Sequence, residues 1–139
     1  MDIGIDIGGS HIGIGIVNEN GIIVEKIEKR IMSKEKKNIK KTLEDYITEQ
    51  IKKFLEKYKI SKIGICSPGT ISNNIIKKSV NLNLENYDLA QEVSKKIEKQ
   101  IKIRNDCECA AIAENKYGCL KGYDRAVFIT LGTGIGGSV

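Results

Sequence analysis

Residues 1–18 read MDIGIDIGGSHIGIGIVN, and this stretch decides how the fold begins. Isoleucine recurs at every second position on each side of the glycine pair Gly8–Gly9. That spacing is the period of a half-buried β-strand. The segment therefore predicts two antiparallel strands joined by a tight glycine turn.

The positions between the isoleucines indicate a backbone that something approaches closely. They carry mostly glycine, together with one carboxylate, Asp6, at the end of the first strand. Glycine weakens a strand because it packs nothing and loses the most backbone entropy on folding. A carboxylate beside bare glycine amides suits Mg²⁺ and the phosphates that it carries. The same residues also fit a plain hairpin in which Asp6 is a solvated charge, and this segment alone favours neither interpretation.

Composition indicates one globular domain of 139 residues, with 40% hydrophobic residues and a net charge of +5. The lysines between Lys29 and Lys59 alternate with glutamates at helical spacing, which is typical of a solvated helix face. With two Phe and no Trp, we expect no nucleic-acid partner. No apolar run is long enough for a membrane span, and the chain opens directly on a strand, so we expect a cytoplasmic location. The four cysteines are expected to be free thiols that form no metal site.

The rest of the chain adds a third strand and then alternating helices and strands. The turn at Asn20–Gly21 predicts an antiparallel strand over 22–31, which completes a three-stranded meander. The fold class is therefore α/β, a mixed sheet that opens with this meander and has helices packed on it. The further expected elements are a helix at 38–58, a strand at 62–66, a short extended piece at 71–77, a loop at 81–84, a helix at 88–101, a strand at 101–104, a helix at 107–117 and a strand at 125–131.

Four loops lie at the ends of strands or at hairpin turns, where open α/β sheets bind ligands. They are 6–10, 67–70, 105–106 and 132–137. Two are glycine turns whose backbone amides could hold phosphates, although no G-x-x-x-x-G-K-[ST] loop is present. The last also matches G-x-G-x-x-G, but a dinucleotide-binding fingerprint opens a helix early in a βαβ unit, and this one lies at the end of the chain.

Four motifs in order carry a resemblance to a known family: DIGGS at 6–10, SPGT at 67–70, NDCECAAIAE at 105–114 and LGTGIGG at 131–137. Together they resemble the N-terminal lobe of the ROK family, which contains repressors and sugar kinases. The resemblance implies an actin-like (ribonuclease-H-like) ATPase fold. It also implies ATP-dependent phosphorylation of a hexose or N-acetylhexosamine, with ATP and the sugar held between two lobes and Mg²⁺ as the metal.

The resemblance assigns roles residue by residue. Asp106 matches the catalytic base, and a carboxylate at a strand end can accept the proton of a sugar hydroxyl. The alternative is that Asp106 only caps the helix that follows, although Asn105 could cap it instead. Three further sets match family positions: phosphate-binding Asp6, Gly8, Gly9 and Ser10, with Asp6 also a magnesium ligand; phosphate-binding Gly132, Thr133, Gly134 and Gly136; and sugar-binding Gly69, Asn81, Asn105 and Asp106.

The resemblance also implies that the chain holds only part of the family's machinery. Residues 1–122 match the N-terminal lobe, and 123–139 match the first strand and glycine turn of a second lobe. The family's zinc-binding cysteine cluster is expected in that second lobe, and none of the four cysteines here belongs to it. The alternatives to a kinase are a sugar-sensing transcriptional regulator of the same family and a non-catalytic fragment. Self-association into a homo-oligomer, through the face that an absent lobe leaves exposed, is compatible with each.

Overall fold

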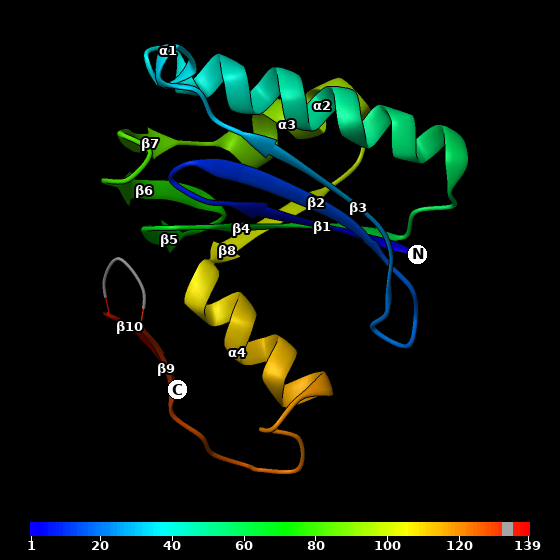
Figure 1. Cartoon of the computed structure of the whole chain (residues 1–139), viewed down its shortest axis with the longest axis vertical. Coiled ribbons are helices and arrows are strands. Elements are labelled where there is room, and N and C mark those ends of the chain that lie inside the picture. The colour runs from blue at the N-terminus through cyan, green and yellow to red at the C-terminus, as the bar shows by residue number, and fades with distance from the viewer. Residues whose placement is uncertain (132–134) are drawn as a thin grey trace.

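The computed structural model describes residues 1–131 and 135–139. A five-stranded mixed sheet in the order β3-β2-β1-β4-β8 organises the chain (Figure 1). The first three strands form the predicted antiparallel meander. Strand β4 then pairs in parallel with β1, and β8 pairs in parallel with β4. The bounds are β1 Asp2–Ile7, β2 His11–Val17, β3 Ile23–Arg30, β4 Lys62–Ser67 and β8 Ile101–Asn105.

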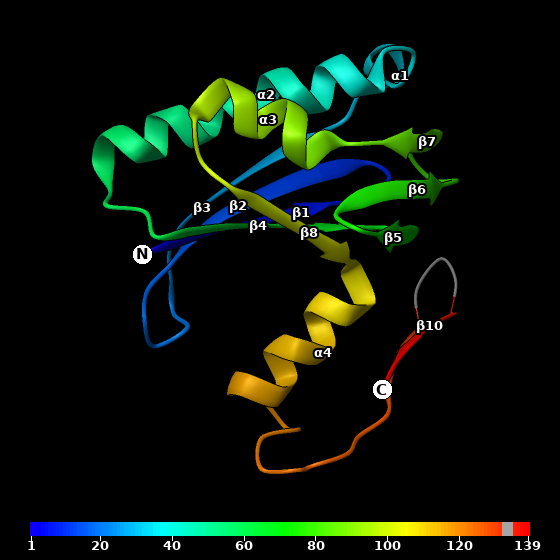
Figure 2. The ribbon, with the colours of Figure 1, turned by 180° about the vertical axis from the view of Figure 1, so that it is seen from behind.

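The core lies between one face of this sheet and two helices, α2 (Ile39–Lys57) and α3 (Leu89–Ile97) (Figures 1 and 2). The alternating isoleucines of β1 and β2 point to this side and are at most 2% exposed. The glycines between them face away from the helices. No atom lies within 4 Å of a Cβ built on Gly4 or Gly64, so the opposite face is open at these positions.

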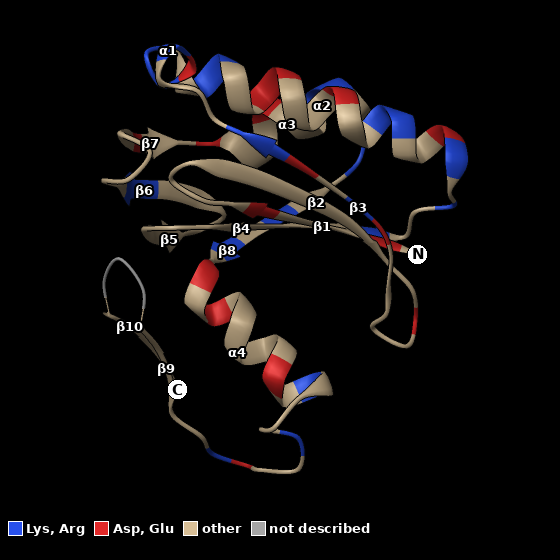
Figure 3. Ribbon diagram, viewed as in Figure 1, with Lys and Arg blue, Asp and Glu red and all other residues tan. Residues whose placement is uncertain are grey.

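The outer side of α2 carries charges of both signs, as Figure 3 shows. One i,i+4 ion pair on it joins Lys53 to Glu49 at 2.6 Å. The expectation of a solvated lysine-rich helix face is therefore confirmed. No helix of the described residues has the length and apolarity that a membrane span requires.

A second sheet lies where we expected only an extended piece at 71–77 and a loop at 81–84. It consists of β5 (Thr70–Ser72), β6 (Ile75–Ser79) and β7 (Leu84–Tyr87) in antiparallel order. The extended backbone and the loop at 81–83 are present, but their pairing into a sheet and the strand β7 were not predicted, because these strands are short and show little alternation. The β5–β6 reversal is made by Asn73 and Asn74, which both adopt left-handed backbone conformations (φ 51° and 66°). Asparagine tolerates that region and forms tight hairpin turns with it.

The helices also differ from expectation. A short helix, α1 (Ser33–Lys36), lies within the segment that we took as an irregular polar connection. The third helix, α3, ends at Ile97 rather than at 101, because Glu98 takes a left-handed conformation (φ 55°). The fourth, α4 (Asp106–Tyr117), begins one residue earlier than predicted.

The chain ends with α4 and a hairpin of β9 (Phe128–Leu131) and β10 (Ile135–Ser138), which starts later than the predicted strand at 125–131. Both views place them on the side of the sheet opposite α2 and α3 (Figures 1 and 2). The hairpin forms a separate two-stranded sheet. Its apolar side chains are exposed, among them Leu131 at 80% and Ile135 at 82%. Such a patch is typical of a surface that another protein segment covers.

Candidate functional site

The loops singled out by sequence converge on one cleft of about 830 Å³. It lies between the ends of β1, β4 and β8, the small sheet and the terminal hairpin. The predicted site residues that line it are Gly8, Gly9, Ser10, Gly69, Asn81, Asn105, Asp106 and Gly136. These residues are far apart in the sequence, and they meet because the carboxyl ends of the parallel strands share one edge of the sheet. Gly132, Thr133 and Gly134 lie outside the described residues.

Gly69 marks the point where β4 passes into the small sheet. Its backbone has φ 107°, and a Cβ there would lie 2.2 Å from the carbonyl oxygen of Lys78. Only glycine fits this close approach without strain. The carbonyl oxygen of Gly69 accepts a hydrogen bond of 2.8 Å from Nδ2 of Asn105. The start of the small sheet is thereby tied to the end of β8.

At the end of β8, one residue caps the following helix and the next residue presents an exposed carboxylate. Oδ1 of Asn105 accepts hydrogen bonds from the amides of Cys107 (2.9 Å) and Glu108 (3.3 Å), so Asn105 is the N-cap of α4. Oδ1 of Asp106 also accepts from the Cys107 amide at 2.9 Å. Among the described residues no hydrogen bond reaches Oδ2 of Asp106, and the residue is exposed to the cleft. The Asp106 carboxylate can therefore receive a ligand while the helix is capped by its neighbour.

In the first glycine turn, two of the three backbone amides of residues 8–10 are available to a ligand. The N–H of Gly8 donates to the carbonyl of His11 (2.8 Å) and closes the hairpin. Gly9 and Ser10 are the two loop residues, and no acceptor among the described residues bonds their amides. A Cβ on Gly9 would lie 3.5 Å from Cβ of Asn81, so the turn faces the small sheet across the cleft.

Asp6 lies near this cleft but does not line it. It pairs in register with Cys66 on the open face of the sheet. The pKa of Cys66 is raised, chiefly by its hydrogen bond to Cys109 and by burial, with smaller contributions from the negative charges of Asp6 and Asp106. Asp6 therefore lies beside Cys66 on the neighbouring strand. No group of three potential metal ligands occurs among the described residues. One carboxylate fits a magnesium ion that takes its other ligands from phosphates and water.

Sequence reasoning missed several residues of the cleft wall. His11 received no role, although it directly follows the DIGGS motif and lines the cleft. Lys36 reaches the cleft from α1, a helix that sequence patterning did not reveal. The remaining lining residues were likewise not singled out: Pro68, Cys107, Thr130, Leu131 and Ile135. The four cysteines are free, as expected.

The strand order, the helices on it and the loops at the strand ends define the fold class, which is that of the actin-like ATPases. Within that class the chain belongs to the ROK family, whose model matches residues 2–139. The crystal structure of a ROK family glucokinase from Streptomyces griseus, in complex with glucose and AMPPNP, superposes with a TM-score of 0.82 at 27% identity. The match covers 98% of this chain and 43% of that one.

Curated relatives include both kinases and repressors. A glucokinase of Thermotoga maritima is 34% identical over 140 residues, which is 99% of this chain and 43% of that protein. The xylose repressor of Bacillus subtilis is 29% identical over 136 residues, which is 96% of this chain and 35% of the repressor. The chain thus spans less than half the length of these relatives.

Proposed function

We propose that this chain is the N-terminal part of an ATP-dependent kinase that phosphorylates a hexose or N-acetylhexosamine. The observation that carries the proposal is the exposed carboxylate of Asp106 in a cleft that also contains a glycine turn with two free amides. The similarity to glucokinases supports it, including one crystallised with glucose and a nucleotide. The family also contains repressors, so the residues of the cleft, rather than membership alone, carry the assignment.

In this proposal the residues of the cleft divide the work. Asp106 accepts the proton of the attacking sugar hydroxyl, and Gly69, Asn81 and Asn105 hold the sugar. Phosphoryl transfer needs mainly positioning and charge neutralisation, so few side chains are required. The phosphates lie against the amides of the first glycine turn and against the glycine-rich segment 132–136. The residues proposed for phosphate are Gly8, Gly9, Ser10, Gly132, Thr133, Gly134 and Gly136, of which Gly8 acts by shaping its turn.

ATP and Mg²⁺ are the proposed cofactors. Asp6 would hold the metal, which when bound neutralises charge on the phosphates. We further propose that residues 1–122 form the N-terminal lobe of the actin-like ATPase fold and that 123–139 begin a second lobe. The exposed apolar side chains of the β9–β10 hairpin support that division, because an isolated two-stranded hairpin is marginally stable in water.

The test is sugar-dependent ADP formation with Mg·ATP and a panel of hexoses and N-acetylhexosamines. It is run on this chain and on a chimera in which residues 1–139 replace the matching 43% of the Thermotoga maritima glucokinase. Asp106→Asn should reduce turnover by roughly 10²- to 10⁴-fold, the usual contribution of a general base, while sugar affinity stays nearly unchanged. Asp124→Asn, an exposed aspartate outside the cleft, is the matched control.

Two outcomes would overturn the proposal. Near-normal turnover in the Asp106→Asn chimera would remove the catalytic role of that residue. Sugar binding without ADP formation in the unsubstituted chimera would favour the second candidate, a sugar-sensing regulator, which the similarity to the xylose repressor supports.

A further inference from the structure

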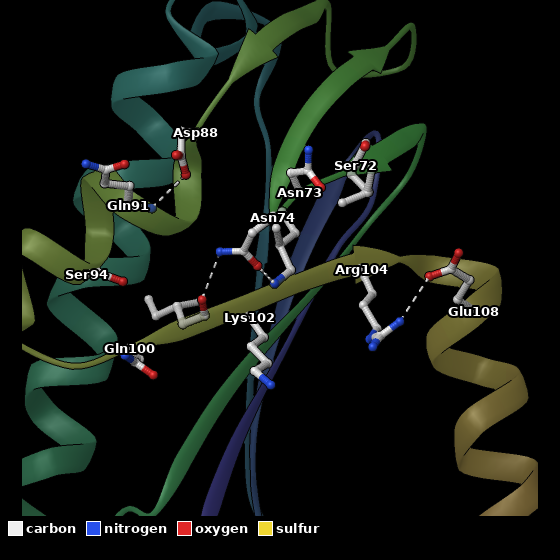
Figure 4. A pocket seen from close by; sticks show the side chains of 13 residues that line it. Ser72, Asn73, Asn74, Asp88, Gln91, Ser94, Gln100, Lys102, Arg104 and Glu108 are labelled. Carbon is white, nitrogen blue, oxygen red and sulfur yellow. Dashed lines mark hydrogen bonds and ion pairs between the residues drawn. The ribbon is translucent and has the colours of Figure 1, made fainter.

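Strand β8 ends at Asn105 and is followed directly by Asp106, the first residue of α4, yet β8 lies at an edge of the five-stranded sheet. Its only strand neighbour in that sheet is β4, with Ile65 opposite Ile103. Backbone groups on the outer side of an edge strand need partners of another kind. The close-up in Figure 4 shows that the side chain of Asn74 faces this outer side.

The amide of Asn74 bonds to β8 in the way that a neighbouring strand would. Its Nδ2 donates to the carbonyl oxygen of Ile101 at 3.1 Å, and its Oδ1 accepts from the N–H of Ile103 at 2.7 Å (Figure 4). A carboxamide carries one acceptor and two donors in one plane, so it can replace a peptide group. The two bonds span 27 and 29 residues of sequence, so they join two separate elements of the fold.

The turn that presents Asn74 contains a natural comparison residue. Asn73 and Asn74 both have left-handed backbones, so both positions suit asparagine or glycine for the same conformational reason. Of these two side chains, however, only that of Asn74 forms hydrogen bonds with other described residues. The backbone requirement and the side-chain contacts can therefore be separated experimentally.

The small sheet is thus bonded to β8 at two places. Asn74, just after β5, bonds near the start of β8, and Gly69, just before β5, accepts the hydrogen bond of Asn105 at the end of β8. The segment from 69 to 74 is held along the edge of β8 between these two bonds. Displacement at Asn74 would therefore be transmitted to Gly69 and to the cleft.

We propose that Asn74 is a positioning residue for the cleft: its amide sets where Gly69 lies relative to Asn105 and Asp106. The role in sugar binding rests on the proposed function, whereas the role in geometry does not. Asn74 lies outside the cleft lining and would touch neither sugar nor nucleotide.

The test compares Asn74→Gly with Asn73→Gly in the 139-residue chain, because glycine keeps the left-handed turn and removes only the side chain. The first readout is amide hydrogen exchange followed by NMR. In Asn74→Gly we expect the Ile103 amide to exchange about tenfold faster, the factor that one net hydrogen bond supplies. We also expect the side-chain NH₂ signals of Asn105 and the amide of Gly69 to shift, whereas Asn73→Gly leaves all three unchanged.

A conservative variant and a binding measurement complete the design. Asn74→Asp tolerates the left-handed backbone and keeps the acceptor for Ile103, but it places a second acceptor where Asn74 donates to the carbonyl oxygen of Ile101, so it should restore protection of Ile103 only in part. Titration with glucose should show an affinity at least roughly threefold lower for Asn74→Gly than for Asn73→Gly.

The NMR signals test the positioning role of Asn74, and sugar binding tests the proposed function, so the two can fail independently. If the Asn105 and Gly69 signals of Asn74→Gly match those of Asn73→Gly, Asn74 only covers the sheet edge and the inference is wrong. If those signals move but the unsubstituted chimera binds none of the panel sugars, the positioning role stands and the proposed function loses its support.

Discussion

Replacing Gly69 by alanine tests whether the close approach of β4 to the small sheet sets the cleft. The added Cβ would lie 2.2 Å from the carbonyl oxygen of Lys78 and 2.8 Å from Cα of Ser79. Both are backbone atoms, so no side-chain rotation can relieve the contact. Gly4 is the matched control, because a Cβ there meets no atom within 4 Å and its backbone is that of an ordinary strand.

The two substitutions should change the free energy of unfolding in opposite directions. At φ 107° a non-glycine residue is strained by about 1–3 kcal/mol, and the forced displacement weakens the Asn105–Gly69 hydrogen bond, worth about 1 kcal/mol. Gly69→Ala should therefore destabilise the chain by about 2–4 kcal/mol. Gly4→Ala should stabilise it by about 0.5–1 kcal/mol, because alanine loses less backbone entropy in a strand.

Urea unfolding followed by far-ultraviolet circular dichroism measures both effects. With a slope of about 2 kcal/mol per molar urea, the middle of the usual range, the midpoint of Gly69→Ala should fall by about 1–2 M. The midpoint of Gly4→Ala should stay constant or rise. A Gly69→Ala midpoint equal to that of the unsubstituted chain would refute the argument, because the small sheet would then tolerate displacement at no cost.

Three further outcomes are expected. The hydrogen bond from Lys96 is the main cause that holds the pKa of Glu44 below its ordinary value. Glu44 therefore stabilises the fold above its unfolded-state pKa, and this contribution is lost as the pH falls through its folded-state pKa. Glu44→Gln should lower the thermal unfolding midpoint at pH 7 and make that midpoint depend less on pH in the acid range. The pKa of Cys109 is lowered, chiefly by its hydrogen bond with Cys66, so Cys66→Ala should slow alkylation of Cys109 by iodoacetamide in peptide mass mapping, whereas Cys66→Ser should not. Leu43→Ala, at a fully buried position of α2, should reduce the unfolding free energy by about 2–5 kcal/mol in urea titration.

Sequence patterning located the core strands well because their signal is strong. The isoleucines of β1 and β2 alternate without interruption, and a one-residue slip would expose all of them, so pattern and structure agree. The small sheet gave no comparable signal. Its β6 strand contains two adjacent lysines, and its turn depends on left-handed asparagines that look like a loop in sequence.

The motifs led to residues that the structure brings to one cleft, whereas side chains that only the fold brings there were not singled out. Gly69 was named because it matches a family position in the SPGT motif, and the structure places it in the cleft lining. Lys36 was missed because α1, with four residues, is too short to show helical periodicity. The bond from Asn74 to β8 was also beyond sequence reasoning, since nothing local distinguishes it from Asn73.

The hydrogen bonds at the end of β8 explain why an Asn–Asp pair suits the proposed chemistry in that order. Asn105 uses its oxygen to cap α4 and one N–H of its amide to hold Gly69, which leaves the second N–H for the proposed sugar contact. A carboxylate there would cap the helix equally well but could not donate to the Gly69 carbonyl. Asp106 is one residue further on, at the start of α4, and among the described residues its Oδ2 accepts no hydrogen bond. Because Asn105 supplies the structural bonds, the neighbouring carboxylate oxygen is available for the proposed proton transfer.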